Sequence, residues 1–172
     1  MTDVTIREAT AADAQALHGL ISAHLAEGHL LPRTQYDLGV HASRFVVCET
    51  DGALVACGEL APLSPAIGEV RSLVVSREYR RAGLAARLFG ELRARAVRAG
   101  FATLSTFTRD ARFFVRQGFS IVPHVWVPAK IAKDCQSCSS FRQCKQYGLV
   151  LHLAAVPLYA PAPARAGHVA VA

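Results

Sequence analysis

The sequence predicts a single α/β domain built on a mixed central sheet of about six or seven strands with flanking helices. Its 172 residues, 52% of them apolar, are enough to bury one sizeable core. Apolar positions repeat at helical spacing in some segments and alternate in others. The predicted strands and helices follow one another in a recognisable order: three consecutive strands come first, and a strand–helix–strand unit follows. This order is typical of a meander followed by a parallel crossover.

The first elements are short. Apolar and polar residues alternate over residues 4–8, which predicts a strand. Thr10 and Asp13 have the spacing of a capping box, and the apolar positions that follow predict an amphipathic helix over residues 11–27. A second short helix is expected over residues 34–42.

A strand meander is expected next. Strands over residues 44–50 and 53–63 flank the dipeptide Asp51-Gly52, which favours a tight hairpin turn. A third strand is expected over residues 67–75. The three strands should therefore lie side by side and antiparallel.

The second half of the chain continues as alternating helices and strands. Residues 82–99 form a helix whose apolar stripe contains Leu84, Leu88 and Leu92, and Gly100 ends it. The remaining elements are a strand over 102–108, a short helix over 110–117, and strands over 119–125 and 147–156. Residues 157–172 are rich in Ala and Pro and are expected to be a disordered tail, which leaves residues 1–156 as the domain.

Composition excludes several classes of protein. No apolar run is long enough to span a membrane, and the first residues lack the pattern of a signal peptide. Five cysteines, an odd number, suggest free thiols in a reducing compartment, so a cytoplasmic location is expected. The net charge of +6 could attract a polyanion, but the basic residues form no compact run. Neither a nucleic acid nor a membrane partner is expected, and a homodimer is compatible with the sequence.

Residues 68–85 predict an anion-binding turn. A buried strand leads into a basic loop, and a turn of small residues around Gly83 opens a helix. Small residues let a ligand approach the backbone, and the free N–H groups of the first helical turn favour an anion such as a diphosphate. The alternative is an ordinary strand–loop–helix whose arginines are solvated.

The motif Arg80-x-x-Gly83-x-Ala85, after Leu73-Val74-Val75, resembles the acyl-CoA-binding motif of the GCN5-related N-acetyltransferases, or GNAT family. The likeness covers about residues 3 to 153, and it implies the splayed GNAT sheet with acetyl-CoA as cosubstrate. It further implies that the end of the 67–75 strand pairs with the pantetheine amides, while the following loop holds the pyrophosphate. The implied cofactor residues are Leu73, Val74, Val75, Arg80, Arg81, Ala82, Gly83, Leu84 and Ala85. The sequence departs from the family at Arg77, where Pro is common, and at Ala82, where a basic residue is usual.

Further segments resemble the short-form amino-acid N-acetyltransferases of arginine biosynthesis, the N-acetylglutamate synthases. They are Leu30-Leu31-Pro32-Arg33, Glu69-Val70-Arg71-Ser72-Leu73, Phe107-Thr108-x5-Phe114 with Gly118-Phe119, and Pro128-x-Lys130-Ile131-x-x-Asp134-Cys135-x-x-Cys138-x-x-Phe141-x-x-Cys144. The last lies in a Cys-rich segment, residues 128–145. The resemblance implies acetylation of the α-amino group of L-glutamate. Other acceptors (glutamine, another amino acid, an amine or a protein N-terminus) stay open, as does a non-catalytic acetyl-CoA-binding domain.

The chemistry of this reaction assigns roles to several residues. The acceptor amine must lose a proton, and Glu69, which matches the family's base position, is the expected general base, acting through a water. Arginine binds carboxylates through two parallel hydrogen bonds, which suits Arg33, the match to the family's carboxylate-binding residue, and Arg71. Ser72 and the Leu31 carbonyl could orient the substrate. The plain alternative is that these charged side chains belong to the surface.

The leaving thiolate needs a hydrogen-bond donor or a proton, unless its low pKa lets it leave without an acid from the enzyme. The resemblance implies a tyrosine in this role, but no tyrosine lies between Tyr79 and Tyr147. Thr108 is therefore the expected donor, with Ser105 as a second candidate, although either hydroxyl could simply bond a strand neighbour.

Three of the cysteines form a cluster, Cys135-x2-Cys138-x5-Cys144. Structural zinc usually takes four ligands, so buried thiols are the expected state and no metal is assigned. Zinc binding and an oxidation-sensitive pair remain alternatives. Cys48 and Cys57 lie in apolar stretches and are expected to be small core residues.

Overall fold

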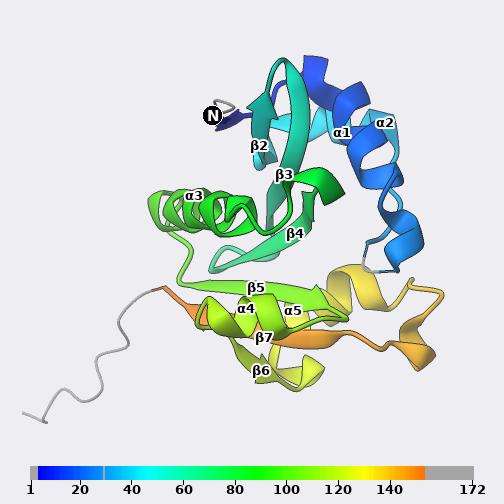
Figure 1. Ribbon diagram of the computed structural model, residues 1–172. Coiled ribbons are helices and arrows are strands. Elements are labelled where there is room, and N and C mark those ends of the chain that lie inside the picture. Colours follow the sequence, from blue (N-terminus) through cyan, green and yellow to red (C-terminus); the bar gives the residue numbers. More distant parts are fainter. Residues whose placement is uncertain (1–3, 29, 154–172) are drawn as a thin grey trace, which may run out of the picture.

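The computed structural model describes residues 4–28 and 30–153, which form one seven-stranded sheet with flanking helices (Figure 1). The strand order is β1-β2-β3-β4-β5-β7-β6. The strands are β1 Thr5–Glu8, β2 Phe45–Thr50, β3 Ala53–Pro62, β4 Ile67–Val75, β5 Thr103–Thr108, β6 Ser120–Val122 and β7 Tyr147–His152. The helices are α1 Ala14–Ser22, α2 Gln35–Val40, α3 Leu84–Arg98, α4 Arg112–Arg116 and α5 Pro128–Lys130. The predicted mixed α/β sheet is confirmed. The predicted tail, residues 157–172, lies outside the described residues.

Two predicted elements are shorter than expected. The helix predicted over residues 11–27 is divided into a 3₁₀ turn at Ala11–Asp13, α1, and a second 3₁₀ turn at Leu25–Glu27. The chain changes from α-helical to 3₁₀ hydrogen bonding after α1, where the His24 amide donates to the Ile21 carbonyl, three residues earlier, at 3.1 Å. The strand predicted over residues 119–125 stops at Val122, because Pro123 has no amide to donate and a 3₁₀ turn follows.

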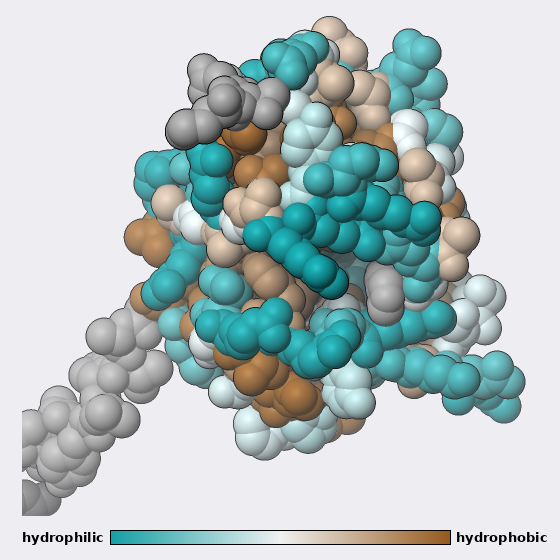
Figure 2. All heavy atoms as spheres, in the orientation of Figure 1, coloured by the Kyte–Doolittle hydropathy of each residue, from teal (hydrophilic) through white to brown (hydrophobic). Residues whose placement is uncertain are grey.

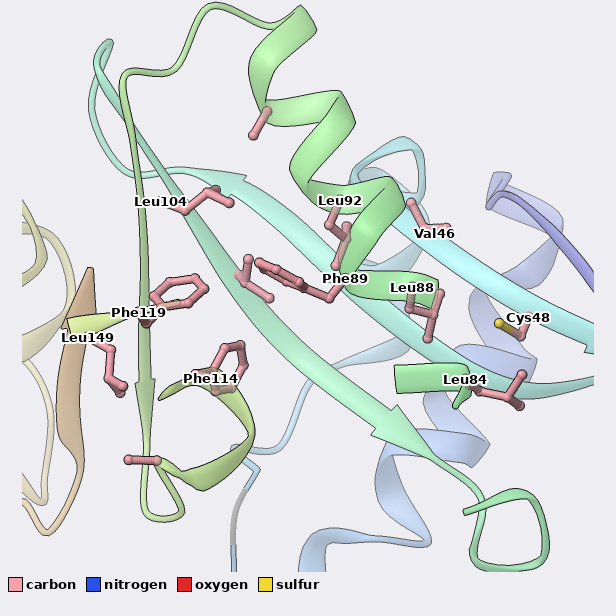
Figure 3. Packing of buried hydrophobic residues seen from close by; sticks show 14 of the residues in the cluster. Val46, Cys48, Leu84, Leu88, Phe89, Leu92, Leu104, Phe114, Phe119 and Leu149 are labelled. Carbon is pink, nitrogen blue, oxygen red and sulfur yellow. The ribbon is translucent and has the colours of Figure 1, made fainter. Parts of the chain in front are cut away.

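The core lies on both faces of the sheet. Leu88 and Leu92 of α3 pack on one face, and α1 and α2 cover the other (Figure 1). β2 supplies both layers, since Val46 faces α3 and Val47 faces α1. In the α3 layer, the ring centroids of Phe89 and Phe119 lie 5.6 Å apart, and the labelled side chains converge from α3, α4 and the segment after it, β2, β5 and β7 (Figure 3). The two layers hold β4, which carries most of the site, rigidly in place.

The sheet opens in its middle. β4 and β5 are parallel and pair over Ile67–Glu69 and Thr103–Ser105, as expected for a strand–helix–strand crossover. Beyond this point the described part of β4 has no strand partner on that side. β4 also carries a bulge against β3, where Ser72 takes the left-handed φ of +48°. The bulge and the divergence of β4 from β5 create the clefts described below.

No helix in the described residues is long and apolar enough to cross a membrane.

Candidate active site

A first cleft of about 700 Å³ opens where β4 and β5 diverge. It is lined by the end of β4, the loop leading into α3, the first turn of α3, and α4. Eight of the nine predicted cofactor residues line it, namely Leu73, Val74, Val75, Arg80, Arg81, Gly83, Leu84 and Ala85. Ala82 lies in the same loop but is not among the lining residues. Thr108, the predicted proton donor, also lines this cleft.

The loop entering α3 suits an anionic ligand. Gly83 is the N-cap of α3 and takes a φ of +77°, and a Cβ there would meet no atom within 4 Å. The space beside it is therefore open to a ligand, and a side chain would fill it. The first backbone hydrogen bond of α3 runs from the Arg87 amide to the Gly83 carbonyl at 3.1 Å. The amides of Leu84 and Ala85 thus have no partner within the helix and carry its positive dipole end.

A carboxylate that lines this cleft, Glu27, holds two arginines, of which Arg80 also lines the cleft. Arg80 Nη2 donates to both oxygens of Glu27 at 2.9 Å, and Arg77 Nε donates to one of them at 3.0 Å. Although burial raises the pKa of Glu27, the hydrogen bonds from Arg77 and Arg80 bring it below its usual value. A diphosphate in the cleft would compete with Glu27 for Arg80.

A second cleft of about 500 Å³ lies on the other side of the β4 bulge. Ser72 lines this cleft whereas Leu73, the next residue, lines the first, so the two clefts meet on one strand. All of the predicted acceptor residues lie here, namely Leu31, Arg33, Arg71 and Ser72, together with Glu69. Figure 2 shows hydrophilic residues gathered across the middle of the face that it views.

Glu69 is buried, with 2% of its surface exposed, and lies in an ion cluster. Its Oε2 accepts hydrogen bonds from Arg71 Nε at 2.8 Å and Nη2 at 2.6 Å, and its Oε1 accepts one from Lys130 Nζ at 2.7 Å. Asp134 Oδ2 joins the same two cations, 2.7 Å from Arg71 Nη2 and 2.8 Å from Lys130 Nζ. Two positive and two negative groups therefore balance. The alternative that Glu69 is a surface carboxylate is wrong.

The cluster shifts the pKa of two of its members, Arg71 and Asp134. Burial lowers the pKa of Arg71, but the neighbouring charge and hydrogen bond of Glu69 outweigh it and leave that pKa raised. Burial raises the pKa of Asp134, yet the hydrogen bond and charge of Lys130 bring it below its usual value. Lys130 also lies over the ring of Phe107, with Nζ 5.1 Å from the centroid.

Arg33 is held by a second buried carboxylate. Arg33 Nη1 donates to Glu59 Oε2 at 2.7 Å, and its guanidinium carbon lies 5.9 Å from the centroid of the Phe45 ring. Both contacts fix the orientation of Arg33 within the second cleft. The alternative that Arg33 and Arg71 are solvated surface arginines is wrong, since each is partly buried and ion-paired.

Comparison with known proteins identifies the fold. Residues 13–119 match the model of the acetyltransferase (GNAT) family. The chain belongs to the GNAT family. An uncharacterized N-acetyltransferase from Chlorobaculum tepidum is 28% identical over 148 residues, which is 86% of this chain and 96% of that protein.

Two further relatives are named for amino-acid acetylation. An amino-acid acetyltransferase of Pseudomonas putida is 35% identical over 117 residues, 67% of this chain but 27% of that protein. The structure of an N-acetylglutamate synthase from Neisseria gonorrhoeae, complexed with coenzyme A and N-acetyl-glutamate, has a TM-score of 0.79 and 27% identity, and covers 90% of this chain and 36% of that one. The chain thus spans little more than a quarter of the first and about a third of the second.

Family membership makes the protein an acetyltransferase that uses acetyl-CoA as its cosubstrate. The first cleft fits this cosubstrate, because it combines the edge of β4 that has no strand partner beyond Glu69 with free amides at the open space beside Gly83. We refer to the first cleft as the cofactor cleft and to the second, which is lined by the residues predicted to bind the acceptor, as the acceptor cleft.

The hydroxyl groups proposed for the leaving thiolate have protein partners. Thr108 Oγ1 accepts from the Asp110 amide at 3.1 Å and lies 3.2 Å from the Asp110 carbonyl. Ser105 is fully buried, and its Oγ donates to the Gly68 carbonyl at 3.4 Å. Of the two, Thr108 alone lines the cofactor cleft of this GNAT enzyme, and its role as a donor stays a prediction.

All five cysteines are free, and they fall into two groups. Cys48 and Cys57 are buried, as expected, and burial raises the pKa of Cys57 to about 12. Cys135 is half-buried, whereas Cys138 and Cys144 are exposed, so the expectation of buried thiols in this cluster is wrong. A π-helical turn at Ile131–Cys135 and the turns after it place the segment at the surface of the GNAT domain. Among the described residues no three His, Cys, Asp or Glu side chains are placed to hold a metal ion.

Several site residues were not assigned roles from the sequence. Glu59 occurs in a strand that is otherwise largely apolar, and a charged residue at a buried strand position signals a partner nearby. Lys130 and Asp134 are four residues apart, the spacing of a helical ion pair, but no helix was predicted there.

Proposed function

We propose that this GNAT enzyme transfers the acetyl group of acetyl-CoA to the α-amino group of L-glutamate, the first step of arginine biosynthesis. One observation carries the proposal. A charged acceptor cleft with a buried carboxylate, Glu69, meets the cofactor cleft at consecutive residues of β4, Ser72 and Leu73. A thioester in one cleft can therefore meet an amine in the other.

The charged groups supply the means to bind an amino acid and remove its proton. A carboxylate has about four acceptor positions, and Glu69 uses three of them, so one remains for a water or for the amine. Glu69 then takes the proton of the ammonium group through that water. Arg33 and Arg71 hold a carboxylate of the substrate, and Ser72 and the Leu31 carbonyl orient its backbone. The neutral amine then attacks the thioester carbonyl of acetyl-CoA, so that a C–N bond forms and the C–S bond breaks. CoA leaves as a thiolate, with Thr108 Oγ1 in the cofactor cleft as the predicted hydrogen-bond donor, and the thiolate is protonated from solvent.

Transfer is direct, in a ternary complex. Cys57 is the cysteine next to the site, and its Sγ lies 3.5 Å from the Ser72 carbonyl. Because burial raises its pKa to about 12, it stays a thiol at neutral pH and cannot act as an acyl-accepting thiolate.

A thiol-release assay tests this function. The enzyme is given acetyl-CoA with each of the twenty amino acids, simple amines and short peptides, and products are identified by mass spectrometry. We expect the highest kcat/KM with L-glutamate, with intersecting double-reciprocal plots. A preference for glutamine or for a peptide N-terminus would show that L-glutamate is not the acceptor. Binding of acetyl-CoA without any turnover would indicate a non-catalytic domain.

A further inference from the structure

One buried carboxylate in the acceptor cleft has incomplete hydrogen bonding. Glu59 is 1% exposed, and its Oε2 is occupied by Arg33. Its Oε1 is buried and accepts no hydrogen bond from the described residues. Buried carboxylate oxygens without donors are rare, because they have lost the hydrogen bonds that water would give. Arg44 Nη1 lies 4.0 Å away, close enough for an ion pair but too far for a hydrogen bond.

Arg44 is also the least engaged cation of this cleft. Arg33, Arg71 and Lys130 donate to carboxylates, and Lys133 Nζ donates to the Pro62 carbonyl at 2.8 Å. Within the described part of the chain, the contact of Arg44 with Glu59 is its single ion pair, and its side chain makes no hydrogen bond. Its side chain is 35% exposed and lines the cleft, so its guanidinium is free to bind a ligand.

The backbone places Arg44 beside Arg33. Arg44 comes directly before β2, and Phe45, the first residue of β2, pairs with Glu59 across the sheet. Arg33 lies over the Phe45 ring and approaches Glu59 Oε2, whereas Arg44 approaches Oε1 of the same carboxylate. At this end of the cleft the Arg44 guanidinium donates no hydrogen bond within the described residues, whereas the cations around Glu69 already donate to carboxylates. An anionic group of the acceptor therefore finds an uncommitted donor here.

We propose that Arg44 binds the side-chain carboxylate of the acceptor and so selects an acidic amino acid over its amide, while Glu59 positions Arg44 and Arg33. This inference rests on the proposed function. A carboxylate offers two charged oxygens to the guanidinium fork, whereas an amide offers one oxygen and an NH₂ group that meets donors. Glutamine would therefore lose both a hydrogen bond and the charge.

The test measures equilibrium binding of glutamate and of glutamine to the CoA-saturated protein by calorimetry, alongside turnover. In Arg44→Gln we expect the glutamate affinity to fall about tenfold or more and the glutamine affinity to fall less than threefold, with kcat nearly unchanged. Arg44→Lys should restore part of the glutamate affinity. Lys133→Gln is the matched control, since it removes the same charge at the same cleft, and it should change both affinities less than twofold. Unchanged CoA binding shows that each variant is folded.

The positioning role of Glu59 has its own readout. Glu59→Gln should raise the KM for glutamate and leave kcat within about threefold, since the arginines lose their shared anchor but Glu69 is untouched. An equal loss of glutamate and glutamine binding in Arg44→Gln, no loss, or equal affinity of the unsubstituted protein for both amino acids would overturn the inference. If glutamate binds selectively through Arg44 but is never acetylated, the proposed function fails while the role of Arg44 stands.

Discussion

Replacing Glu69 by Gln tests the assigned base most directly. The substitution keeps the size of the side chain but removes the charge that accepts three hydrogen bonds at 2.6 to 2.8 Å. A positioned general base contributes roughly 10² to 10⁴ in rate, which is about 3 to 5 kcal/mol of activation free energy. We therefore expect kcat to fall at least a hundredfold in Glu69→Gln while the affinity for acetyl-CoA is retained.

The same substitution should also lower stability. Arg71 and Lys130 would share Asp134 alone, and the new amide would turn an N–H₂ group toward one of them. Removing one partner of a buried ion pair costs roughly 3 to 5 kcal/mol. The two cations are 25% and 13% exposed, so water can compensate in part and we expect about 2 to 3 kcal/mol. Assays should be run well below the melting temperature, with acetyl-CoA titrations to confirm a folded cofactor cleft.

Asp134→Asn separates catalysis from charge balance. It removes a charge from the same cluster, but from a carboxylate that is more exposed and is not assigned to the proton. We expect a comparable loss of stability with less than a tenfold loss of kcat. The reasoning on Glu69 fails if Glu69→Gln keeps more than a third of the original rate from pH 6 to 9, or if Asp134→Asn is equally slow.

Three further predictions follow from the same structure. Gly83→Ala should weaken acetyl-CoA binding at least tenfold in a calorimetric titration but destabilise the protein by only about 1 kcal/mol, because the Cβ enters open cleft space at a φ of +77°; unchanged affinity would contradict the cofactor assignment. Arg33→Ala should raise the acceptor KM and lower the melting temperature, since it leaves the carboxylate of Glu59 buried without its donor. Adding Glu59→Ala should recover stability but not KM, and recovery of both would reject the binding role of Arg33. In a thiol titration with an aromatic disulfide at pH 8, Cys138 and Cys144 should react quickly and Cys57 only after unfolding, since burial raises its pKa to about 12; rapid reaction of Cys57 would refute its burial.

Local signals predicted most of the fold. Asp51-Gly52 is the turn between β2 and β3, with Asp51 at a φ of +49° and Gly52 at +76°. The apolar stripe of α3 packs on the sheet as its spacing requires, and the parallel pairing of β4 with β5 follows from the helix between them. These features depend on residues within a few positions of one another. The bulge at Ser72 had no such signal, because a serine at positive φ is imposed by tertiary structure.

The candidate site was predicted residue by residue but not as a set of contacts. Glu69 and Lys130 are 61 residues apart, and Arg33 and Glu59 are 26 apart. Their pairing depends on strand register and on the path of the loop after Val127, which neither spacing nor periodicity reveals. The sequence therefore pointed to residue types suited to binding a carboxylate and removing a proton, whereas the ion pairs that fix their positions required the folded structure.

Pairing the cations of the acceptor cleft before substrate binds has a consequence for catalysis. An unpaired arginine in solvent must lose side-chain freedom and hydration when it meets a carboxylate, and this opposes binding. Glu59 already orients Arg33 and Glu69 already orients Arg71, so most of this loss of freedom and hydration occurs on folding rather than on substrate binding. The buried carboxylates weaken the attraction for an anion, but they hold the donors in a fixed geometry. A site arranged in this way discriminates between acceptors by the position of each charge rather than by its net charge. A substitution that neutralises one of these charges should therefore change the choice of acceptor strongly, although it changes the net charge of the protein by only one.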